Sequence, residues 1–286
     1  MNRPAYLTEA AIAQFIQTAL TEDIGEGDHS SLATIPQEKT TRAKLLVKDD
    51  GIIAGLELAE KIFRAIDPTL SLTHYKNDGD TVAKGDAAFE VTGNARAILS
   101  GERLVLNCIQ RMSGIATKTH SLCELIKDTH TQLLDTRKTT PNFRLAEKWA
   151  VAIGGGRNHR FALYDMIMLK DNHLDVSGGI TKAVGLAVQY LKDHQKNLLI
   201  EVETRNLAEV KEALTTHAVD VIMLDNMSPA MMKEAVAMVN GQCKTEASGG
   251  ITESNLKEVA QCGVDYISIG ALTHSVKSLD LSLKVF

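Results

Sequence analysis

Several familiar catalytic and binding motifs are missing from this 286-residue sequence. It contains neither a Gly-x-Ser-x-Gly elbow nor a His-Glu-x-x-His pair, which argues against the hydrolases that carry those motifs. The glycine run Gly154–Gly156 matches neither a Walker loop nor the Gly-x-Gly-x-x-Gly turn of dinucleotide-binding proteins. The informative features are instead the distribution of charge and the rhythm of the apolar segments.

The chain is also poor in cysteine, in long apolar runs and in excess positive charge. Its 4 cysteines are scattered without a C-x-x-C pair, so we expect reduced thiols in a cytoplasmic protein and no zinc site. No apolar run approaches the ~20 residues that span a bilayer, and no signal peptide is visible. A net charge of -5 and a pI near 6.0 favour neither nucleic acid nor a membrane as partner.

Positive charge is nevertheless concentrated in one segment, from Leu134 to His173. Because planar guanidinium groups match carboxylates and phosphates, this cluster predicts a site for a small, multiply charged anion. One of its members, Lys148, is expected to be solvated in the middle of a helix. The basic residues of the segment are Arg137, Lys138, Arg144, Lys148, Arg157, Arg160 and Lys170, against the acidic Asp135, Glu147, Asp165 and Asp171.

The order of the apolar segments predicts an α/β protein in two parts. The first third has α+β character, including a helix from Ala95 to about Cys108. From about Ser113, short apolar strands alternate with helices, which favours a β/α barrel, with a doubly wound open sheet as the alternative. The expected strands are Gln132–Asp135, Met166–Leu169, Leu198–Val202, Val221–Leu224, Lys244–Ala247 and Tyr266–Ile269. The expected helices are Phe143–Ala152, Ile180–Lys192, Leu207–Thr216, Ala230–Val239 and Glu253–Cys262.

Each expected strand ends in polar or charged residues. In a β/α barrel the carboxyl ends of all strands meet at one face, where active sites lie, so these residues are predicted to form a single site. The alternative is that polar residues follow strands in any α/β protein because loops are exposed. The six strand ends read LLDTRKT, IMLKDNH, IEVETRN, IMLDNMS, TEASGGI and ISIGALT.

Glycine-containing loops follow the last two expected strands, at Ser248–Gly250 and Ile269–Leu272. Glycine lets backbone N–H groups approach an anion closely, and a helix that begins near Thr252 or Glu253 would favour phosphate at its N-terminus. Paired loops of this kind form the phosphate site of many barrels, so we predict phosphate binding here rather than two plain turns.

Two acidic residues, Glu203 and Asp225, lie at successive strand ends. They could hold Mg²⁺, accept hydrogen bonds from sugar hydroxyls, or simply form ion pairs with Lys138 or Lys170. Glu201 would point to the same side of its strand as Glu203, so the pattern alone does not separate the two glutamates.

Two further expectations concern the basic residues themselves. His159 and Arg160 follow the glycine run, which predicts a mobile anion-binding segment with that run as its hinge. Lys170 could form a Schiff base, as in an aldolase, if its surroundings lowered its pKa. A protein that binds a phosphorylated metabolite without catalysis is a third possibility.

The motifs resemble the quinolinate phosphoribosyltransferase family in order, from about Glu22 to the C-terminus. TRKTTP and the pair NHR and MLKDNH are the most specific. The resemblance implies an N-terminal α+β domain over 1–113, an open or incomplete β/α barrel over 114–270, and a segment over 271–286 that returns to the first domain. The segments that carry it are EDIGEGD, GERLVLNCIQRMSGIAT, DTRKTTPNFR, GGGRNHRFALYDMIMLKDNH, EVE, IMLDN, EASGGI and ISIGALT.

The resemblance also implies a reaction. Phosphoribosyl would pass from phosphoribosyl pyrophosphate to quinolinate with decarboxylation, giving nicotinate mononucleotide, pyrophosphate and carbon dioxide in de novo NAD biosynthesis. A homodimer or hexamer is implied, in which Arg103 completes the partner's site. Two features depart from the family pattern: GDHSS stands in place of GD-hydrophobic-T-T, and one extra residue lies near Thr215–His217. A related transferase-like family of molybdenum uptake is an alternative, which TRKTTP and NHR disfavour.

The residue roles implied by the resemblance divide into two groups. The catalytic residues are Lys138, Lys170, Glu203 and Asp225, with Mg²⁺ held by Glu203 and Asp225. The substrate-binding residues are these four together with Arg103, Thr136, Arg137, His159, Arg160, Ser248, Gly249, Gly250, Ile269, Gly270 and Ala271.

Overall fold

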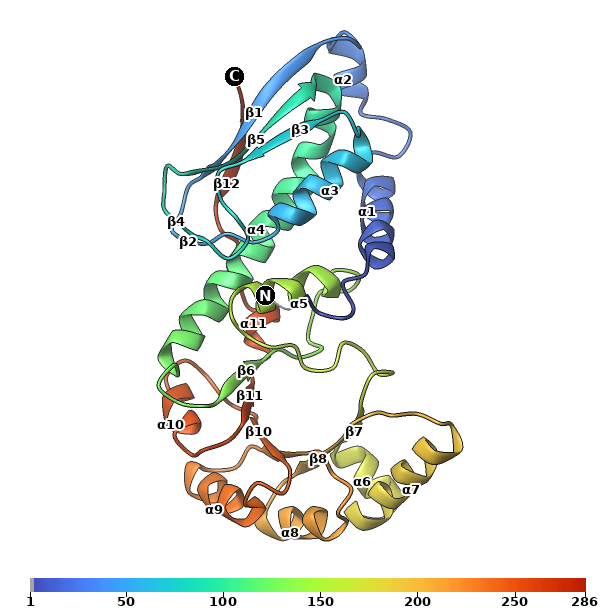
Figure 1. Cartoon of the computed structure of the whole chain (residues 1–286), viewed down its shortest axis with the longest axis vertical. Helices are drawn as coiled ribbons and strands as arrows, with labels where there is room; N and C mark the ends of the chain where they lie inside the picture. Colours follow the sequence, from blue (N-terminus) through green and yellow to red (C-terminus); the bar gives the residue numbers. More distant parts are fainter. Residues whose placement is uncertain (1–2) are drawn as a thin grey trace. The chain divides into compact units, whose positions relative to one another are not determined.

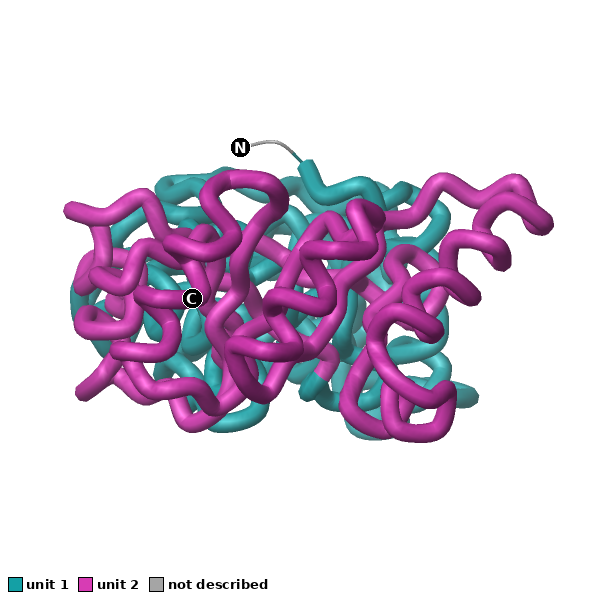
Figure 2. Tube along the Cα trace, turned by 90° about the horizontal axis from the view of Figure 1, so that it is seen from below, with its two compact units in different colours: residues 1–120, 138–155, 271–286 teal, residues 121–137, 156–270 magenta. Residues whose placement is uncertain are grey.

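The computed structural model describes residues 3–286 as two compact units, each discontinuous in sequence (Figures 1 and 2). The first unit comprises residues up to 120, 138–155 and 271–286, and the second comprises 121–137 and 156–270. The boundary proposed at 113/114 lies inside one long helix, α4, at Ala95–Leu125. The boundary at 270/271 coincides with a change of unit.

The first unit is built on a four-stranded antiparallel sheet in the order β12-β1-β5-β3. Figure 1 shows β12, the C-terminal strand, beside β1, so the end of the chain returns to the N-terminal sheet as expected. A second pair, β2 and β4, is also antiparallel. The strands are β1 (Thr40–Val47), β2 (Gly51–Ile52), β3 (Ser71–His74), β4 (Thr81–Val82), β5 (Ala87–Asn94) and β12 (Leu281–Val285).

Helices complete this unit and supply most of its core. In α3, Leu58, Ala59, Ile62 and Phe63 are buried at helical spacing, and Phe63 meets Phe89 of the sheet edge-to-face at 6.2 Å between ring centroids. The helices are α1 (Glu9–Asp23), α2 (His29–Thr34), α3 (Leu56–Ile66), the main part of α4, α5 (Arg144–Ile153) and α11 (Ala271–His274).

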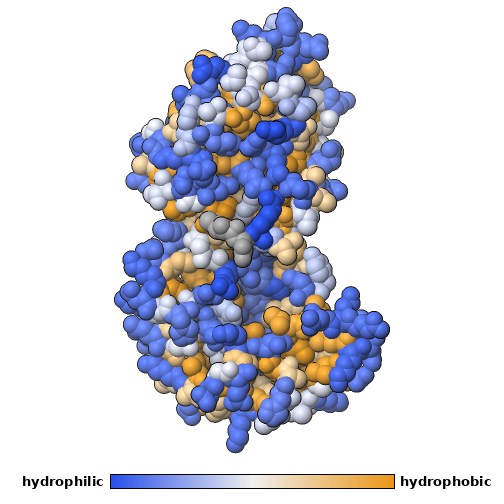
Figure 3. Space-filling view, in the orientation of Figure 1, coloured by the Kyte–Doolittle hydropathy of each residue, from blue (hydrophilic) through white to orange (hydrophobic). Residues whose placement is uncertain are grey.

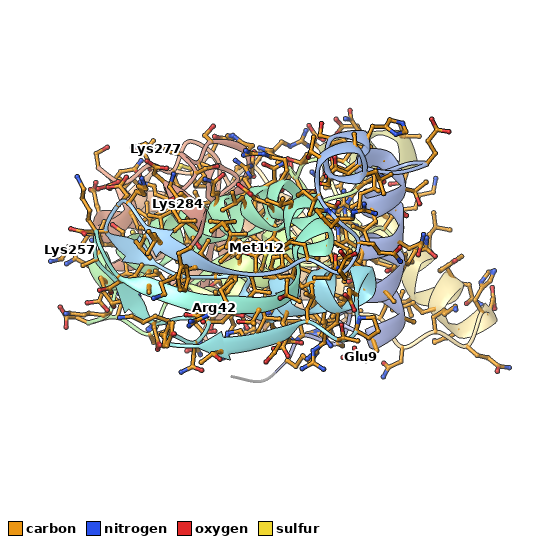
Figure 4. All side chains as sticks on the ribbon, turned by 90° about the horizontal axis from the view of Figure 1, so that it is seen from above. Glu9, Arg42, Met112, Lys257, Lys277 and Lys284 are labelled. Atoms are coloured by element: carbon orange, nitrogen blue, oxygen red, sulfur yellow. The ribbon has the colours of Figure 1, made fainter. Side chains whose placement is uncertain are left out.

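Helix α4 continues well beyond Cys108, where the sequence was expected to end it. Buried Ile109, Met112 and Ala116 continue the apolar stripe, and Figure 4 labels Met112 near the middle of the view. Gly114 allows a close approach rather than a break, because a Cβ there would lie 2.3 Å from the carbonyl oxygen of Lys277. The glycine therefore belongs to the helix and accommodates the returning C-terminal segment.

The second unit contains six parallel strands in the order β6-β11-β10-β9-β8-β7. Because β6 and β7 are the two edges and do not pair with each other, this sheet is an open β/α barrel, and the expected fold class is confirmed. The strands are β6 (Gln132–Leu134), β7 (Ile167–Leu169), β8 (Ile200–Thr204), β9 (Val221–Asp225), β10 (Lys244–Ser248) and β11 (Tyr266–Ser268).

Most barrel helices occur where the sequence predicted them. Strand β8 begins at Ile200 rather than Leu198, and a short helix that was not predicted, α6, follows β7. Helix α10 has only five residues, preceded by a turn at Thr252. The helices are α6 (Asp171–Ser177), α7 (Ile180–Asp193), α8 (Leu207–Thr215), α9 (Pro229–Val239) and α10 (Leu256–Ala260). Among the described residues, no helix has the length and apolar character needed to cross a membrane.

Candidate active site

The interior face of the barrel carries charged residues in two levels. Alternation along β8 places Glu201 and Glu203 on one face, with Glu203 nearer the carboxyl end of the strand. On β10 the same alternation groups Glu246 with Ser248. Glu201 and Glu246 are completely or almost completely buried, whereas Glu203 and Ser248 are half-buried. The deeper glutamates therefore underlie the strand ends where the sequence predicted a site.

His159 lies directly between the two deep glutamates. Its Nε2 is 2.8 Å from Oε2 of Glu201 and 3.4 Å from Oε2 of Glu246, and only 8% of its side chain is exposed. Burial lowers the pKa of His159, but the two carboxylates outweigh burial and raise that pKa to about 10. Burial, followed by the charge of Glu246, raises the pKa of the Glu201 carboxyl.

The other ring nitrogen of His159 is also engaged. The backbone N–H of Arg160 points at Nδ1 over 2.7 Å, and Nδ1 can accept this bond only without a proton. The carboxylates favour the doubly protonated ring, so the two contacts oppose each other at Nδ1. Both contacts agree at Nε2. This nitrogen carries a proton in the doubly protonated ring and also in the neutral ring whose Nδ1 accepts from Arg160, and it donates that proton to Glu201.

The segment that carries His159 is firmly attached to the sheet. Arg157 bridges to Leu134 of β6, and its N–H donates to the Leu133 carbonyl at 2.8 Å. The fully buried carboxylate of Asp135 accepts from the side chain of Asn158 at 2.6 Å and from the backbone N–H of His159 at 2.9 Å. The segment 157–160 was expected to be mobile, but its backbone is bonded to the sheet at several points. The boundary between the two units falls just before it, between Gly155 and Gly156.

The guanidinium groups of Arg137 and Arg160 act on each other through their charges. Burial and the neighbouring charge of Arg137 lower the pKa of Arg160, while Glu201 and Asp165 oppose that shift. Arg160 also donates to the carbonyl of Met166 at 3.3 Å, which fixes its direction. Two neighbouring like charges suit an anion, and anion binding by this pair stays a prediction.

The carboxylates at the next strand ends also influence one another. Burial, followed by the charges of Asp225 and Asp171, raises the pKa of Glu203, and Lys170 lowers it. The backbone N–H of Asp171 donates to Glu203. Mutually repelling carboxylates beside a lysine form an oxygen-rich donor set that suits a hard divalent cation. Among residues 3–286, the one compact trio of potential metal ligands is a different one, His159, Glu201 and Glu246.

The loop Ser248–Gly250 has the geometry that only glycine permits. Gly249 and Gly250 have φ angles of 88° and 61°, and a Cβ on Gly249 would lie 2.3 Å from Oδ1 of Asn226. Asn226, itself at φ 54°, donates its N–H to the Ser248 carbonyl, while Asn255 donates its side-chain N–H to the Gly250 carbonyl. These contacts hold the loop open at the end of β10.

Three expected site residues belong to the first unit. Arg103 is exposed on α4, Lys138 is exposed after β6, and Ala271 begins α11. The backbone of Lys138 is fixed because its carbonyl accepts from the Thr273 hydroxyl at 2.8 Å. Of the remaining expected residues, Thr136, Gly270 and the buried Ile269 lie in the second unit, at the ends of β6 and β11.

A buried ion pair supports the loop after Lys138. Glu147 is fully buried and accepts from Arg111 at 3.1 and 2.9 Å and from the N–H and hydroxyl of Thr140 at 3.0 and 2.9 Å. Arg111 also donates to the carbonyls of Thr273 and Val276. The solvated position expected for Lys148 is wrong: its side chain is fully buried, because α5 is buried nearly all round.

Comparison with known proteins decides the family. The description "Quinolinate phosphoribosyl transferase, C-terminal domain" matches residues 115–284, and the corresponding N-terminal domain matches residues 28–113. The chain belongs to the quinolinate phosphoribosyltransferase family. Neither match supports the aldolase or the molybdenum-uptake alternative.

Relatives of this phosphoribosyltransferase chain are similar over nearly its whole length. A tobacco (Nicotiana tabacum) protein named quinolinate phosphoribosyltransferase [decarboxylating] 2a, mitochondrial, is 49% identical, covering 94% of this chain and 81% of its own. A probable nicotinate-nucleotide pyrophosphorylase [carboxylating] of Bacillus subtilis is 46% identical, with 92% and 90% covered. The crystal structure of NadC from Streptococcus pyogenes superposes with a TM-score of 0.91 at 39% identity, covering 98% of both chains.

Two residues that hold this buried cluster together are not singled out by the sequence. The sequence shows Asp135 only as an acid within the basic segment and Glu246 only as part of a strand end. The available signal for both was an isolated acid at an inward position among apolar neighbours, in LLDT and TEAS. A buried charge of that kind normally has a partner, which here is a neighbour far away in sequence.

Proposed function

We propose that this chain transfers phosphoribosyl from phosphoribosyl pyrophosphate to quinolinate, releasing pyrophosphate and carbon dioxide and forming nicotinate mononucleotide in NAD biosynthesis. The observation that carries the proposal is the second unit's strand-end face. There Arg137, the carboxylates of Glu203 and Asp225, and the loop Ser248–Gly250 follow the strands of one parallel sheet. The charge of Arg137 also acts on Arg160, which lies in the segment before β7. The names of the relatives agree with this reaction.

The residues divide by the charge that they would meet. Arg137 and Arg160 would bind the carboxylates of quinolinate, with Arg103 supplied by a partner subunit. The expected contact of His159 with quinolinate is not supported, because both of its ring nitrogens are engaged within the protein, by Glu201 and by the Arg160 N–H. Lys138 and Lys170 would face both substrates. The loop Ser248–Gly250 and the segment Ile269–Ala271 would bind the 5′-phosphate, and Thr136 would contact substrate at the end of β6. Loss of pyrophosphate leaves an electron-poor ribose, which the neighbouring carboxylates of Glu203 and Asp225 would stabilise.

Decarboxylation then needs no separate acid or base. Once the ring nitrogen carries ribose it is cationic and accepts the electron pair of the departing carboxylate. The role of the protein is to orient quinolinate and to hold the two anionic substrates together.

Magnesium would accompany phosphoribosyl pyrophosphate. The donor set at Glu203 and Asp225 fits Mg²⁺, because burial and then the charge of Asp225 raise the pKa of Glu203, and a divalent cation would relieve that repulsion. When bound, the ion would make pyrophosphate a better leaving group. Lys170 beside these carboxylates would neutralise further charge on the substrate.

We also propose a homodimer or hexamer with an active site shared between subunits. Exposed apolar side chains on α6 and α7 support an interface: Val176 is 90%, Leu186 57% and Tyr190 49% exposed. Figure 3 shows hydrophobic atoms over the area where Figure 1 places these helices. Light scattering coupled to size exclusion tests the assembly.

We propose a cytoplasmic location, which cell fractionation tests. The test is needed because the tobacco relative is named mitochondrial and another from Arabidopsis chloroplastic.

The test of the reaction is release of carbon dioxide from carboxyl-labelled quinolinate. Release should require phosphoribosyl pyrophosphate and Mg²⁺ together, and no turnover with both present would contradict the proposal. Arg137→Ala should lose quinolinate binding while phosphoribosyl pyrophosphate binding survives. Normal binding of both ligands by this variant would refute the role of Arg137 and leave the reaction itself standing.

A further inference from the structure

We propose that Glu201 and Glu246 are positioning residues that hold His159, and through it Arg160, in place to receive a carboxylate of the substrate. The inference rests on the proposed function, in which Arg160 binds quinolinate. It adds a deeper level to the site: two buried glutamates on β8 and β10 that never meet the substrate themselves.

The first argument is geometric. Nε2 of His159 points away from the strand ends and into the barrel, 2.8 Å from Glu201 and 3.4 Å from Glu246. The same ring meets the Arg160 backbone N–H through Nδ1 at 2.7 Å. The imidazole therefore links the barrel interior to the backbone of the residue whose guanidinium lies beside Arg137.

The second argument is the energetic cost of this arrangement. Within the described chain, Oε1 of Glu201 and both carboxylate oxygens of Glu246 are buried without a hydrogen-bond partner. A buried acceptor left without a hydrogen bond is destabilising, although Oε2 of Glu246 keeps its ion pair with His159. One imidazole cannot donate to both carboxylates fully, so the pair is more polar than packing alone requires. A core that served packing alone would hold apolar side chains here.

The third argument is the direction of the resulting field. The negative charge of Glu201 acts on Arg160 in the opposite sense to the repulsion from Arg137. The carboxylate therefore offsets the repulsion between the two guanidinium groups, which favours their staying together as a site for an anion.

The fourth argument is that the rest of the segment is anchored independently. Asp135 and the bridge between Leu134 and Arg157 fix the backbone up to His159. The phosphate loop is held by Asn226 and Asn255 instead. Loss of the glutamates should therefore affect Arg160 and quinolinate more than phosphoribosyl pyrophosphate.

The experiment compares E201Q, E246Q and the double variant with wild type in the full-length enzyme. The KM of each substrate and kcat are measured separately, with T245V as the matched control. Thr245 is buried on β10 beside Glu246, points to the opposite face, and bonds to Asp265 rather than to the cluster. We expect the double variant to raise the KM for quinolinate at least tenfold, with the KM for phosphoribosyl pyrophosphate changed less than twofold. T245V should leave both constants unchanged.

Two further measurements separate positioning from simple structural support. In nitrogen-15 spectra of wild type, the His159 Nε2–H proton should be visible through its bond to Glu201, and it should disappear in E201Q/E246Q. The conservative E246D should keep that proton and most of the quinolinate affinity. If the double variant does not fold, E201Q alone carries the test, because Glu201 is the nearer carboxylate, 2.8 Å from Nε2.

Three outcomes would overturn the proposal while the wild-type enzyme remains active. These are an unchanged quinolinate KM in the double variant, an equal rise in the KM of both substrates, and a stoichiometric transition metal in the purified protein that E246Q removes. The last result would mean that His159, Glu201 and Glu246 ligate a metal, so that Nε2 is no donor. An inactive wild type would instead refute the proposed function.

Discussion

The ion pair between Arg111 and Glu147 offers a quantitative test of how the first unit supports the loop after Lys138. Glu147 has no exposed side-chain area and accepts four hydrogen bonds, two from Arg111 and two from Thr140, whereas 24% of the Arg111 side chain is exposed. Breaking a buried pair by removing one partner costs about 3–5 kcal/mol. The cost of removing Glu147 should lie near the lower end of this range, because Arg111 still donates to two backbone carbonyls and is partly exposed to solvent.

Removing Arg111 should cost more, because it leaves the fully buried carboxylate with Thr140 alone. We therefore expect about 3 kcal/mol for E147L and about 4 kcal/mol for R111M. The double variant should be less destabilised than the sum of the two by about 3 kcal/mol, since neither charge is then left uncompensated. Urea unfolding followed by circular dichroism measures all three free energies of unfolding.

A matched cycle on the more exposed pair Glu60 and Arg64 of helix α3 provides the control, and its coupling should be about 0.3–0.5 kcal/mol. Additive single effects in the Arg111–Glu147 cycle, or a cost below about 1 kcal/mol for R111M, would refute the reasoning. Activity gives a second readout, because Glu147 holds Thr140 and Arg111 holds Thr273, the donor to the Lys138 carbonyl.

Three further predictions concern individual residues. G249A should raise the KM for phosphoribosyl pyrophosphate at least tenfold in steady-state assays, because a Cβ would strike Asn226 and the φ of 88° strains an L-residue by about 1–2 kcal/mol; an unchanged KM would show that the loop does not hold phosphate. Burial raises the pKa of Cys108 to about 12, so iodoacetamide at pH 8 should leave this thiol unmodified in the native protein and label it in urea, as read by mass spectrometry; rapid native labelling would contradict its burial. Borohydride in the presence of carbonyl compounds should trap no adduct on Lys170, and a stable adduct would revive the aldolase alternative.

The barrel was largely predictable from the sequence, because its strands are short apolar runs bounded by polar ends. All six strands were expected in the correct order, and the shift of β8 to Ile200–Thr204 is a matter of two residues. The length of α4 was underestimated, since the helix runs to Leu125 and Gly114 within it permits contact with the C-terminal segment. A single sequence does not reveal which glycines are needed for close packing.

The site was predictable in its cations but not in what lies beneath them. Arg137 and Arg160 stood out because a basic segment is unusual in an acidic chain. The sequence could not show that His159 turns inward to Glu201 and Glu246, because that contact joins three distant segments. Lys148 was misjudged for a similar reason, since its burial depends on everything packed around α5.

The most direct test of the central claim is a pyrophosphate-release assay with quinolinate compared against nicotinate, at equal concentrations and with phosphoribosyl pyrophosphate and Mg²⁺. The two acids differ by one carboxylate, which the neighbouring guanidinium groups of Arg137 and Arg160 are arranged to bind. A kcat/KM at least a hundredfold higher for quinolinate is the predicted result. Equal rates, or a preference for nicotinate, would contradict the assignment of the substrate.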